Sequence, residues 1–398
     1  MQRRKYLIIL IVLVTLIFVS SLYYIKDDTK KDSNNPIDDR DDLEDEDIGE
    51  EGKNTATILV TGDIMYHEPQ IEAAYDSNSG TYDFSDNFKY VKKYIDSADL
   101  SIANFETVIA GEEIAFTGFP KFNSPKETLY SIKDAGFDVL TTVNNHALDQ
   151  GKTGIINTIN TIEELGMKNV GTYKEPNNDI LIEKVNDINL ALLSYSYGFN
   201  GLESYLTEEE LSYMVNTIDE EKIEEDIKEA KELDADMVMI FIHWGKEYHK
   251  KPTEHQLELG NKMVEWGANM VFGSHPHVIQ KSDMINHNGN DNYIIYSMGN
   301  FLSNQREETV GNRHTEDGVM VEIELEKNIK NNKVYIKSVN HIPTWVRKYS
   351  GDTGLKYEII PIQDFIDDKE LLFKLEDSEQ FRIRESYENT INKTEQRN

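Results

Sequence analysis

Short apolar runs alternate with segments of helical spacing along the chain from residue 54 onward. The apolar runs have strand length, end in polar residues and include TATILVTGD, DLSIANFE, FDVLTTVNNH, MVMIFIHWG and NMVFGSH. Helical patterns lie between them, such as PKETLYSIKDAG, with Pro125 at its start and Gly136 at its end, and TEHQLELGNKMVEWGA. This alternation predicts an α/β domain with largely parallel sheets covered by helices.

The pattern changes after Gly318. The segments GVMVEIELEK and KVYIKSV alternate apolar and polar positions, which predicts further strands, and a polar C-terminus with some helical character follows them. We therefore expect the main domain to span residues 54–317. Residues 318–398 should add strands that complete this domain, plus a polar tail.

The first 26 residues predict a membrane anchor. Arg3, Arg4 and Lys5 precede an uncharged stretch over residues 6–24, close to the roughly 20 residues that a spanning helix needs. The basic residues favour a cytoplasmic N-terminus, with the main domain outside the cell membrane after a single pass. A cleaved signal peptide is the alternative, but the apolar stretch is long for one and no A-x-A site follows.

An acidic segment separates this anchor from the domain. Residues 27–53 contain few apolar side chains and many Asp and Glu, which predicts an extended, disordered linker. A calcium-binding or partner-binding tail is the alternative interpretation of such a charge run.

Charge and cysteine content narrow the functional classes. With 41 Lys and Arg against 73 Asp and Glu, the formal net charge is -32, which opposes binding to nucleic acid. The chain has no cysteine, which excludes disulfides, thiolate metal ligands and a cysteine nucleophile. Any bound metal must therefore use His, Asp, Glu or Asn side chains.

Ligand-capable side chains gather where the predicted strands end. In chain order they are Asp63, Asn104, Glu106, Asn144, Asn145, His146, His243, His275, His277 and Asn300. Because ligands bind at the carboxyl ends of the strands in open α/β sheets, we expect them to converge on one crevice. Singly, each has a simpler explanation, as a helix cap, a turn residue or a core histidine. Together, imidazole, carboxylate and amide groups favour one or two divalent ions of Mn, Fe or Zn.

His275 and His277 flank a single proline, Pro276. If strand geometry persists here, residues i and i+2 point to the same side, so both imidazoles would reach neighbouring positions.

Several segments together resemble the capsule-synthesis CapA family. They are TGDIMYHEPQ, SIANFETVIAG, FPKFNSPKETLYSIKDAGFDVLTTVNNHALDQG, FIHWGKEY, GSHPHV and YSMGNF, and the resemblance runs from about Thr57 to Phe301. The resemblance implies a divergent relative of the calcineurin-like metallophosphoesterases. The implied fold is a four-layer α/β/β/α metallophosphatase-like sandwich with a two-metal centre, preceded here by an N-terminal transmembrane helix.

The resemblance also implies the metal ligands: Asp63, Glu106, Asn145, His243, His275 and His277. One ion would be held by Asn145, His243 and His275, and the other by His277 with Asp63. Glu106 would bridge the two ions.

Roles beside the metal follow the same resemblance. His146 would be the acid beside the attacked group without binding a metal ion. We also expect Asn104, Asn144 and Asn300 to contact the substrate.

The sequence departs from the metallophosphoesterase pattern at three positions. Met65 stands where the first strand should supply a second imidazole ligand, Ala147 replaces an acidic residue after His146, and Glu106 replaces an aspartate. A thioether binds hard divalent ions poorly. His67, two residues after Met65, could take over as ligand or could contact the substrate, and we count it with His146 as a catalytic candidate.

Two functions are compatible with these features. The first is a membrane-anchored, extracellular component of poly-γ-glutamate capsule biosynthesis that elongates or exports the polymer with a ligase and small membrane proteins. The alternative is a stand-alone, metal-dependent phosphoesterase or polymer hydrolase. A purely structural scaffold is a third possibility, so the sequence leaves open whether the chain is an enzyme.

Overall fold

A computed structural model describes residues 53–176, 179–352 and 354–395. The predicted anchor over residues 1–26 and all but Lys53 of the predicted linker lie outside these ranges. Within them, no helix is both long enough and apolar enough to cross a membrane.

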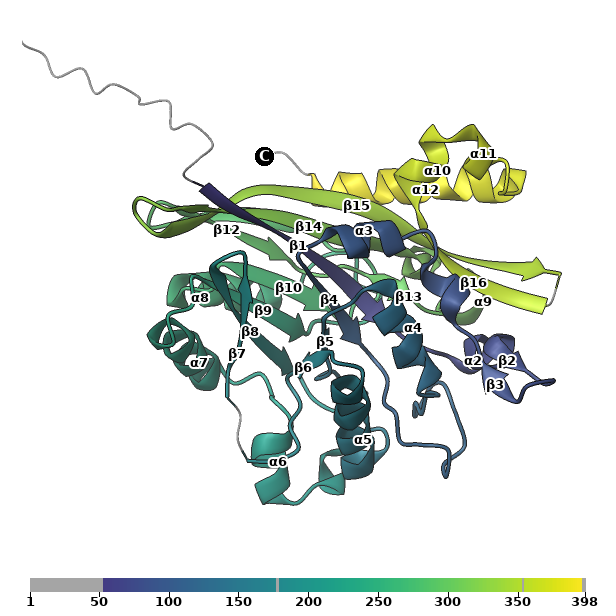
Figure 1. The fold of residues 1–398 in the computed structure, drawn as a ribbon, viewed down its shortest axis with the longest axis horizontal. Coiled ribbons are helices and arrows are strands. Elements are labelled where there is room, and N and C mark those ends of the chain that lie inside the picture. Colours follow the sequence, from purple (N-terminus) through teal and green to yellow (C-terminus); the bar gives the residue numbers. More distant parts are fainter. Residues whose placement is uncertain (1–52, 177–178, 353, 396–398) are drawn as a thin grey trace, which may run out of the picture. The chain divides into compact units, whose positions relative to one another are not determined.

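The described residues form two large sheets (Figure 1). The first sheet has eight strands, in the order β16 (Gly354–Pro361), β15 (Lys333–Gly351), β14 (Asp317–Asn328), β1 (Lys53–Ile64), β4 (Leu100–Phe105), β5 (Val139–Thr141) and β6 (Lys168–Val170), with β13 (Asn300–Leu302) paired to β1. The second has six, in the order β11 (Ser282–His287), β12 (Asn290–Ile295), β10 (Met270–Ser274), β9 (Met237–His243), β8 (Ile188–Ser196) and β7 (Leu181–Val185).

The strand directions confirm the α/β prediction and refine it. The run β1, β4, β5 and β6 is parallel, as is the run β8, β9, β10 and β12. By contrast, β14, β15 and β16 add antiparallel strands to one sheet, and β7 and β11 form antiparallel edges of the other. Both sheets are therefore mixed, with parallel strands where the candidate ligands lie.

Helices cover the outer faces of the two sheets (Figure 1). Apolar residues of α3 (Lys92–Ser97) and α4 (Glu127–Ala135) join the core on the first sheet, and those of α7 (Glu220–Glu232) and α8 (Glu254–Trp266) join the core on the second. The inner faces of the two sheets share a third core. The remaining elements are α2 (Glu68–Ala74), β2 (Tyr75–Asp76), β3 (Thr81–Tyr82), α5 (Gly151–Glu164), α6 (Glu208–Met214), α9 (Glu307–Val310), α10 (Ile362–Asp367), α11 (Lys369–Leu372) and α12 (Asp377–Thr394).

The apolar runs of the central strands are continuous because these strands are buried on both faces. In β9, Met239 and Phe241 belong to the core between the sheets, whereas Val238 and Ile240 belong to the core under α7 and α8. Successive side chains of a strand point to opposite faces, so each central strand needs apolar residues at every position. In β9 the only polar residue, His243, therefore lies at the strand's carboxyl end.

The predicted helix boundaries have physical causes in the structure. At the start of α8, the Thr253 hydroxyl accepts a hydrogen bond from the Gln256 backbone N–H at 3.2 Å. The C-cap of α8 is Gly267, which has a φ of 114°, a left-handed conformation that glycine adopts without strain. Gly136 ends α4 in the same way, with a φ of 108°.

The C-terminal helix α12 is joined to the first sheet by a buried arginine. Arg347 of β15 donates to both carboxylate oxygens of Glu379 in α12, at 2.8 and 2.6 Å. It also donates to Glu358 of β16 at 2.9 Å and to the Lys374 carbonyl at 3.1 Å. Such a multidentate arrangement fixes α12 in position.

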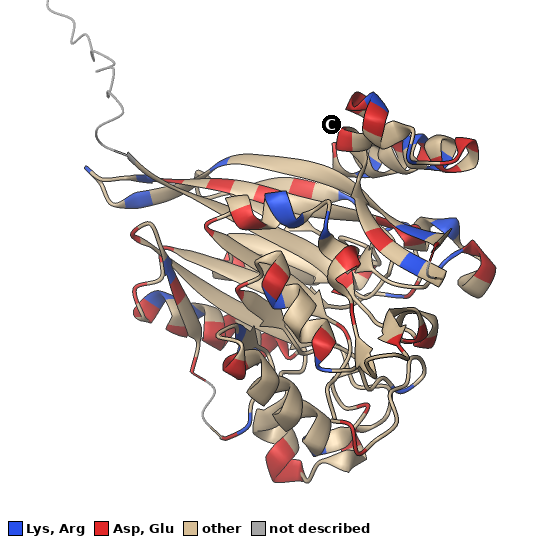
Figure 2. Cartoon of the chain, turned by 45° about the vertical axis from the view of Figure 1, so that its right-hand side comes forward, with Lys and Arg blue, Asp and Glu red and all other residues tan. Residues whose placement is uncertain are grey.

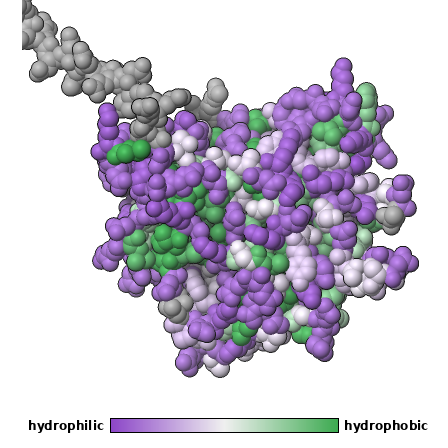
Figure 3. All heavy atoms as spheres, viewed as in Figure 1, coloured by the Kyte–Doolittle hydropathy of each residue, from purple (hydrophilic) through white to green (hydrophobic). Residues whose placement is uncertain are grey.

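Acidic side chains are spread over the surface of the molecule. Asp and Glu recur along the helices, loops and outer strands in Figure 2, with fewer Lys and Arg among them. The face seen in Figure 3 is mostly hydrophilic, with apolar residues in smaller patches. The acidic excess thus lies mainly where water solvates it.

We expect the Arg347→Met substitution to destabilise the fold by about 3 kcal/mol, because it leaves the buried Glu358 carboxylate with only Lys89 and a tyrosine hydroxyl as partners. Urea denaturation followed by circular dichroism measures the loss. The matched control, Lys337→Met, breaks the exposed Lys337–Glu324 pair and should cost less than about 1 kcal/mol. Equal losses in both variants would contradict the structural role of Arg347.

Candidate metal centre

The carboxyl ends of the central strands of both sheets meet at one site. Asp63 and Asn104 are register partners at the ends of β1 and β4, and Ser274 and His243 are partners at the ends of β10 and β9. A Cβ atom on Gly62 would lie 2.0 Å from the Gly299 carbonyl oxygen, so glycine is required for the approach that sets the position of Asp63.

Two buried carboxylates form the centre of this site. Asp63 accepts a hydrogen bond from the Asn104 amide at 2.8 Å, and its other oxygen lies 3.2 Å from His277 Nδ1. Glu106 is fully buried, and its Oε1 atom has no hydrogen-bond partner. Burial, and then the charge of Asp63, raise the pKa of Glu106 well above its usual range. A buried carboxylate oxygen of this kind suits a cation.

Three imidazole rings surround Glu106. The Oε1 atom of Glu106 lies 3.6 Å from His243 Nε2 and 3.7 Å from His277 Nε2. His243 Nε2 also lies 2.8 Å from Asn145 Oδ1, and its Nδ1 atom is 2.9 Å from the Ser274 hydroxyl. This places Asn145 beside the same ligand atoms.

Burial favours the neutral form of His243 and His275, which is the form that binds metals. It lowers the pKa of His275 to about 3 and that of His243 well below its usual range. His275 Nδ1 is buried without a hydrogen-bond partner, the second such atom at this site after Glu106 Oε1.

Strand geometry does not continue through His275 and His277, so the condition for their pointing to the same side as strand residues is not met. Strand β10 ends at Ser274, and the two histidines have φ values of 92° and 55°, in the left-handed region. Non-glycine residues adopt this region rarely, mostly where surrounding structure imposes it. The turn nevertheless brings the two ring centroids within 5.9 Å of each other.

Three groups of side chains in the described structure place ligand atoms within 4.8 Å of one another. They are Glu106, His243 and His275; Asp63, Glu106 and His277; and Glu247, His275 and His277. Glu106 belongs to the first two groups, so its position is compatible with a bridging ligand. The nitrogen and oxygen donors, together with the two unpartnered buried atoms, fit a divalent transition metal.

His146 lies beside this cluster and is oriented by a carboxylate. Its Nδ1 atom is 2.8 Å from an Asp149 oxygen that also accepts the Phe122 backbone N–H at 2.7 Å. The His146 ring contacts the edge of the Phe122 ring, with centroids 4.7 Å apart. His146 lines two neighbouring pockets of about 310 and 350 Å³.

The three asparagines predicted to contact substrate have their hydrogen bonds within the protein. Asn104 bridges Asp63 to Thr141, and Asn144 joins the Phe105 carbonyl to the His146 backbone. Asn300 Oδ1 lies 3.0 Å from His277 Nδ1, and its amide donates to the Thr315 carbonyl at 2.9 Å. In this structure they orient the ligand-capable residues.

His67 and Met65 lie in the wall of the 310 Å³ pocket. His67 is half-buried at the N-cap of α2, and its Nδ1 atom accepts a hydrogen bond from the Asn304 backbone at 3.3 Å. Burial lowers the pKa of His67 to about 4. It belongs to none of the three ligand groups, so the structure places it as a pocket residue next to the cluster.

The sequence interpretation did not include two residues of the site. Glu247 completes one ligand group, and Ser274 holds His243. Their signal in the sequence was weak, since Glu247 follows a strand end by four residues and Ser274 resembles any strand-terminal serine.

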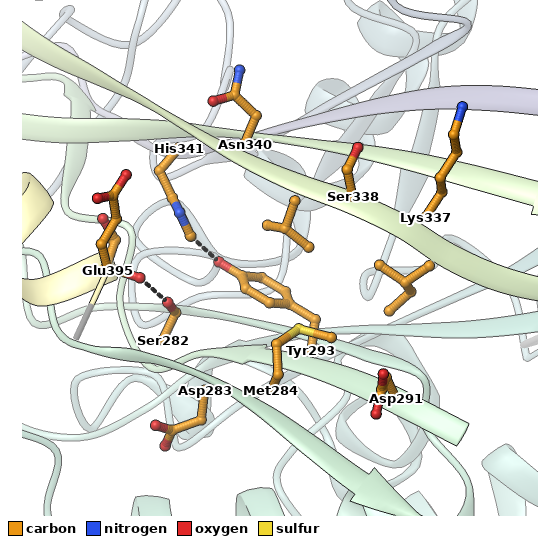
Figure 4. A pocket seen from close by; sticks show the side chains of 13 residues that line it. Ser282, Asp283, Met284, Asp291, Tyr293, Lys337, Ser338, Asn340, His341 and Glu395 are labelled. Carbon is orange, nitrogen blue, oxygen red and sulfur yellow. Dashed lines mark hydrogen bonds between the residues drawn. The ribbon is translucent and has the colours of Figure 1, made fainter. Parts of the chain in front are cut away.

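A larger pocket of about 600 Å³ lies away from this centre, between β11, β12 and β15 (Figure 4). The Tyr293 hydroxyl and His341 Nε2, 2.8 Å apart, meet inside it. None of the three ligand groups of the described residues includes a residue that lines this pocket. The candidate metal ligands are therefore concentrated at the strand ends.

Among solved structures, similarity is low. A phosphatase from Mycoplasma pneumoniae has a TM-score of 0.43 and 16% identity, covering 73% of this chain and 93% of that one. The NAD nucleotidase of Haemophilus influenzae has a TM-score of 0.44 and 11% identity, covering 85% and 60%. Similarities at this level do not establish an activity.

Sequence similarity is more informative. The "Capsule biosynthesis protein CapA" of Bacillus anthracis is 31% identical over 281 residues, covering 68% of this chain and 64% of the relative. The "PGA biosynthesis protein CapA" of Bacillus subtilis (strain 168) is 29% identical over 250 residues, covering 61% of each. The matches thus span less than two thirds of either relative's length. The family described as "Bacterial capsule synthesis protein PGA_cap" matches residues 57–305. Since that match covers more than half of the sequence, the chain belongs to the PGA_cap family of bacterial capsule synthesis proteins.

Proposed function

We propose that this chain takes part in capsule synthesis by acting on poly-γ-glutamate through a divalent-metal centre. Family membership and the capsule-biosynthesis names of its relatives support the biological context. The observation that carries the chemistry is the overlap of three ligand groups, two of which share Glu106, with two buried ligand atoms left unpartnered.

The ligand groups define two overlapping metal positions. Glu106, His243 and His275, with the Asn145 amide oxygen beside them, would hold one ion. Asp63, Glu106 and His277 would hold the other, so that Glu106 bridges. Mn, Fe and Zn accept this mixture of imidazole, carboxylate and amide donors.

A bound divalent ion would lower the pKa of a water molecule and offset negative charge that develops on the substrate. The protein contributes the proton. With the Nδ1 atom of His146 held by Asp149, the Nε2 atom is left to serve a leaving group in the adjoining pocket. The Phe122 ring fixes the imidazole plane. These contacts support His146 as the acid.

We place this domain outside the cell membrane, held by the anchor and acidic linker predicted over residues 1–53. A ligase that makes the polymer and small membrane proteins that pass it outward are the expected partners. The domain would then elongate, process or export the polymer on the outer side.

A stand-alone hydrolase is the second candidate function. The His146–Asp149 pair favours it, because a carboxylate-oriented histidine beside a ligand cluster suits general acid catalysis. A polymer-handling scaffold has no need of this pair.

We expect the purified full chain to contain close to stoichiometric metal by elemental analysis, and the His275→Ala variant to lose most of it. Removal of metal from the wild type should lower the melting temperature by about 5 °C, because a ligand that binds only the folded state stabilises it. The exposed His255→Ala variant is the control. Wild-type protein that neither contains nor is stabilised by Mn²⁺, Fe²⁺ or Zn²⁺ would refute the metal centre.

The His146→Ala substitution should slow hydrolysis of bis(p-nitrophenyl) phosphate by about 10²-fold to 10⁴-fold, since it removes the proton donor. Elemental analysis should show unchanged metal, because His146 belongs to none of the ligand groups. Asp149→Asn, which removes the charge beside His146 Nδ1 and can reverse the tautomer of the ring, should slow the reaction in the same direction. A metal-loaded wild type without turnover would favour the non-hydrolytic role.

Deletion of the gene in its own host should lower cell-bound poly-γ-glutamate, and the wild-type chain should restore it. The His275→Ala chain, expressed at the same level, should not. Full restoration by His275→Ala would separate capsule synthesis from the metal centre.

A further inference from the structure

Glu247 brings a third carboxylate to the metal centre. One of its oxygens lies within 4.8 Å of ligand atoms of both His275 and His277. The residue lies in the loop between β9 and α8, where the next residue, Tyr248, donates its backbone N–H to the Pro276 carbonyl at 2.8 Å. The loop that carries Glu247 is thereby tied to the turn that carries the two histidines.

Without Glu247, the metal position at His277 has too few ligands. Asp63, Glu106 and His277 provide three ligands, whereas Zn²⁺ takes four and Mn²⁺ or Fe²⁺ commonly more. Met65, in the wall of the same pocket, offers only a thioether. His275 Nδ1, on the buried side, has no hydrogen-bond partner. This unpartnered atom is an independent sign that a cation belongs here.

We propose that Glu247 is a further ligand of the ion that His277 shares with Asp63 and Glu106, and that it closes the metal centre on its solvent side. This inference rests on the proposed function, because it requires the metal centre. It adds a ligand from a loop that is exposed to solvent.

The charge of Glu247 already acts on the site. Burial raises the pKa of Tyr248 to about 12, and the charge of Glu247 is the second-largest cause of this rise. The charge of Glu247 also adds to that of Asp63 in raising the pKa of Glu106. Three carboxylates therefore share one small region, and a divalent ion between them offsets their mutual repulsion.

Glu68 provides the comparison that separates a ligand from an ordinary surface carboxylate. It is exposed and lines the same pocket as Glu247, but it belongs to none of the ligand groups. Only Glu247 has both histidines within reach.

The test is titration of the metal-free full chain with Mn²⁺, with free Mn²⁺ followed by electron paramagnetic resonance. We expect the wild type to bind two ions and Glu247→Gln to weaken one of them by on the order of 100-fold, because even loss of an outer-shell partner costs 10-fold to 100-fold. Glu68→Gln should bind like the wild type. Glu247→His, which supplies a softer donor, should regain binding of Zn²⁺ more than of Mn²⁺.

The outcomes separate this inference from the proposed function. If the wild type binds no Mn²⁺ and no Zn²⁺, the proposed metal centre itself fails. If the wild type binds two ions and Glu247→Gln binds them equally well, only the role of Glu247 is refuted. Equal weakening in Glu247→Gln and Glu68→Gln would also refute it, because the effect would then come from net charge. Glu247 is exposed, so melting curves of the metal-free variants should match the wild type.

Discussion

The arrangement of the site depends on a carboxylate buried where water cannot reach it. Glu106 is fully buried beside Asp63, and one of its oxygens has no hydrogen-bond partner. An unpaired buried carboxylate costs several kcal/mol unless it takes up a proton or a cation offsets its charge. Burial lowers the pKa of His243 and of His275, which opposes their supplying that charge themselves. A divalent ion satisfies the carboxylates and the imidazoles at once.

The two-sheet architecture produces this burial. The central strands are largely apolar on both faces and carry their ligand-capable residues at their carboxyl ends, and the two sheets bring those ends together. The polar residues around the site form hydrogen bonds that orient the candidate ligands. Asn104 holds Asp63, Asn300 holds His277 and Ser274 holds His243. A metal site of this kind requires that its ligands be oriented by such outer partners.

The sequence was informative where local patterns decide the structure. The strand ends and the glycine at Gly136 that ends α4 were both readable from the order of residues. Long-range packing decided the rest. The pairing of β13 with β1 and the docking of α12 through Arg347 follow from contacts across the fold, which no local pattern contains. The left-handed turn at His275 is imposed by its surroundings, and Glu247 comes from a loop whose position is set by a backbone bond to that turn.

Charge explains how an acidic protein could act on an acidic polymer. With a net charge of -32, the chain repels a polyanion that comes within about a Debye length of its surface, roughly 8 Å at physiological salt. Lys121 is the only Lys or Arg among the described residues that line the two pockets at His146, and its ammonium group donates to the Tyr205 hydroxyl at 2.7 Å. Attraction for an anionic group would therefore come mainly from the metal ions proposed to bind Glu106 and its neighbours. Because that attraction is short-ranged, it can act on one linkage or chain end at a time. Such a site suits the processing of a passing polymer better than its storage along the surface.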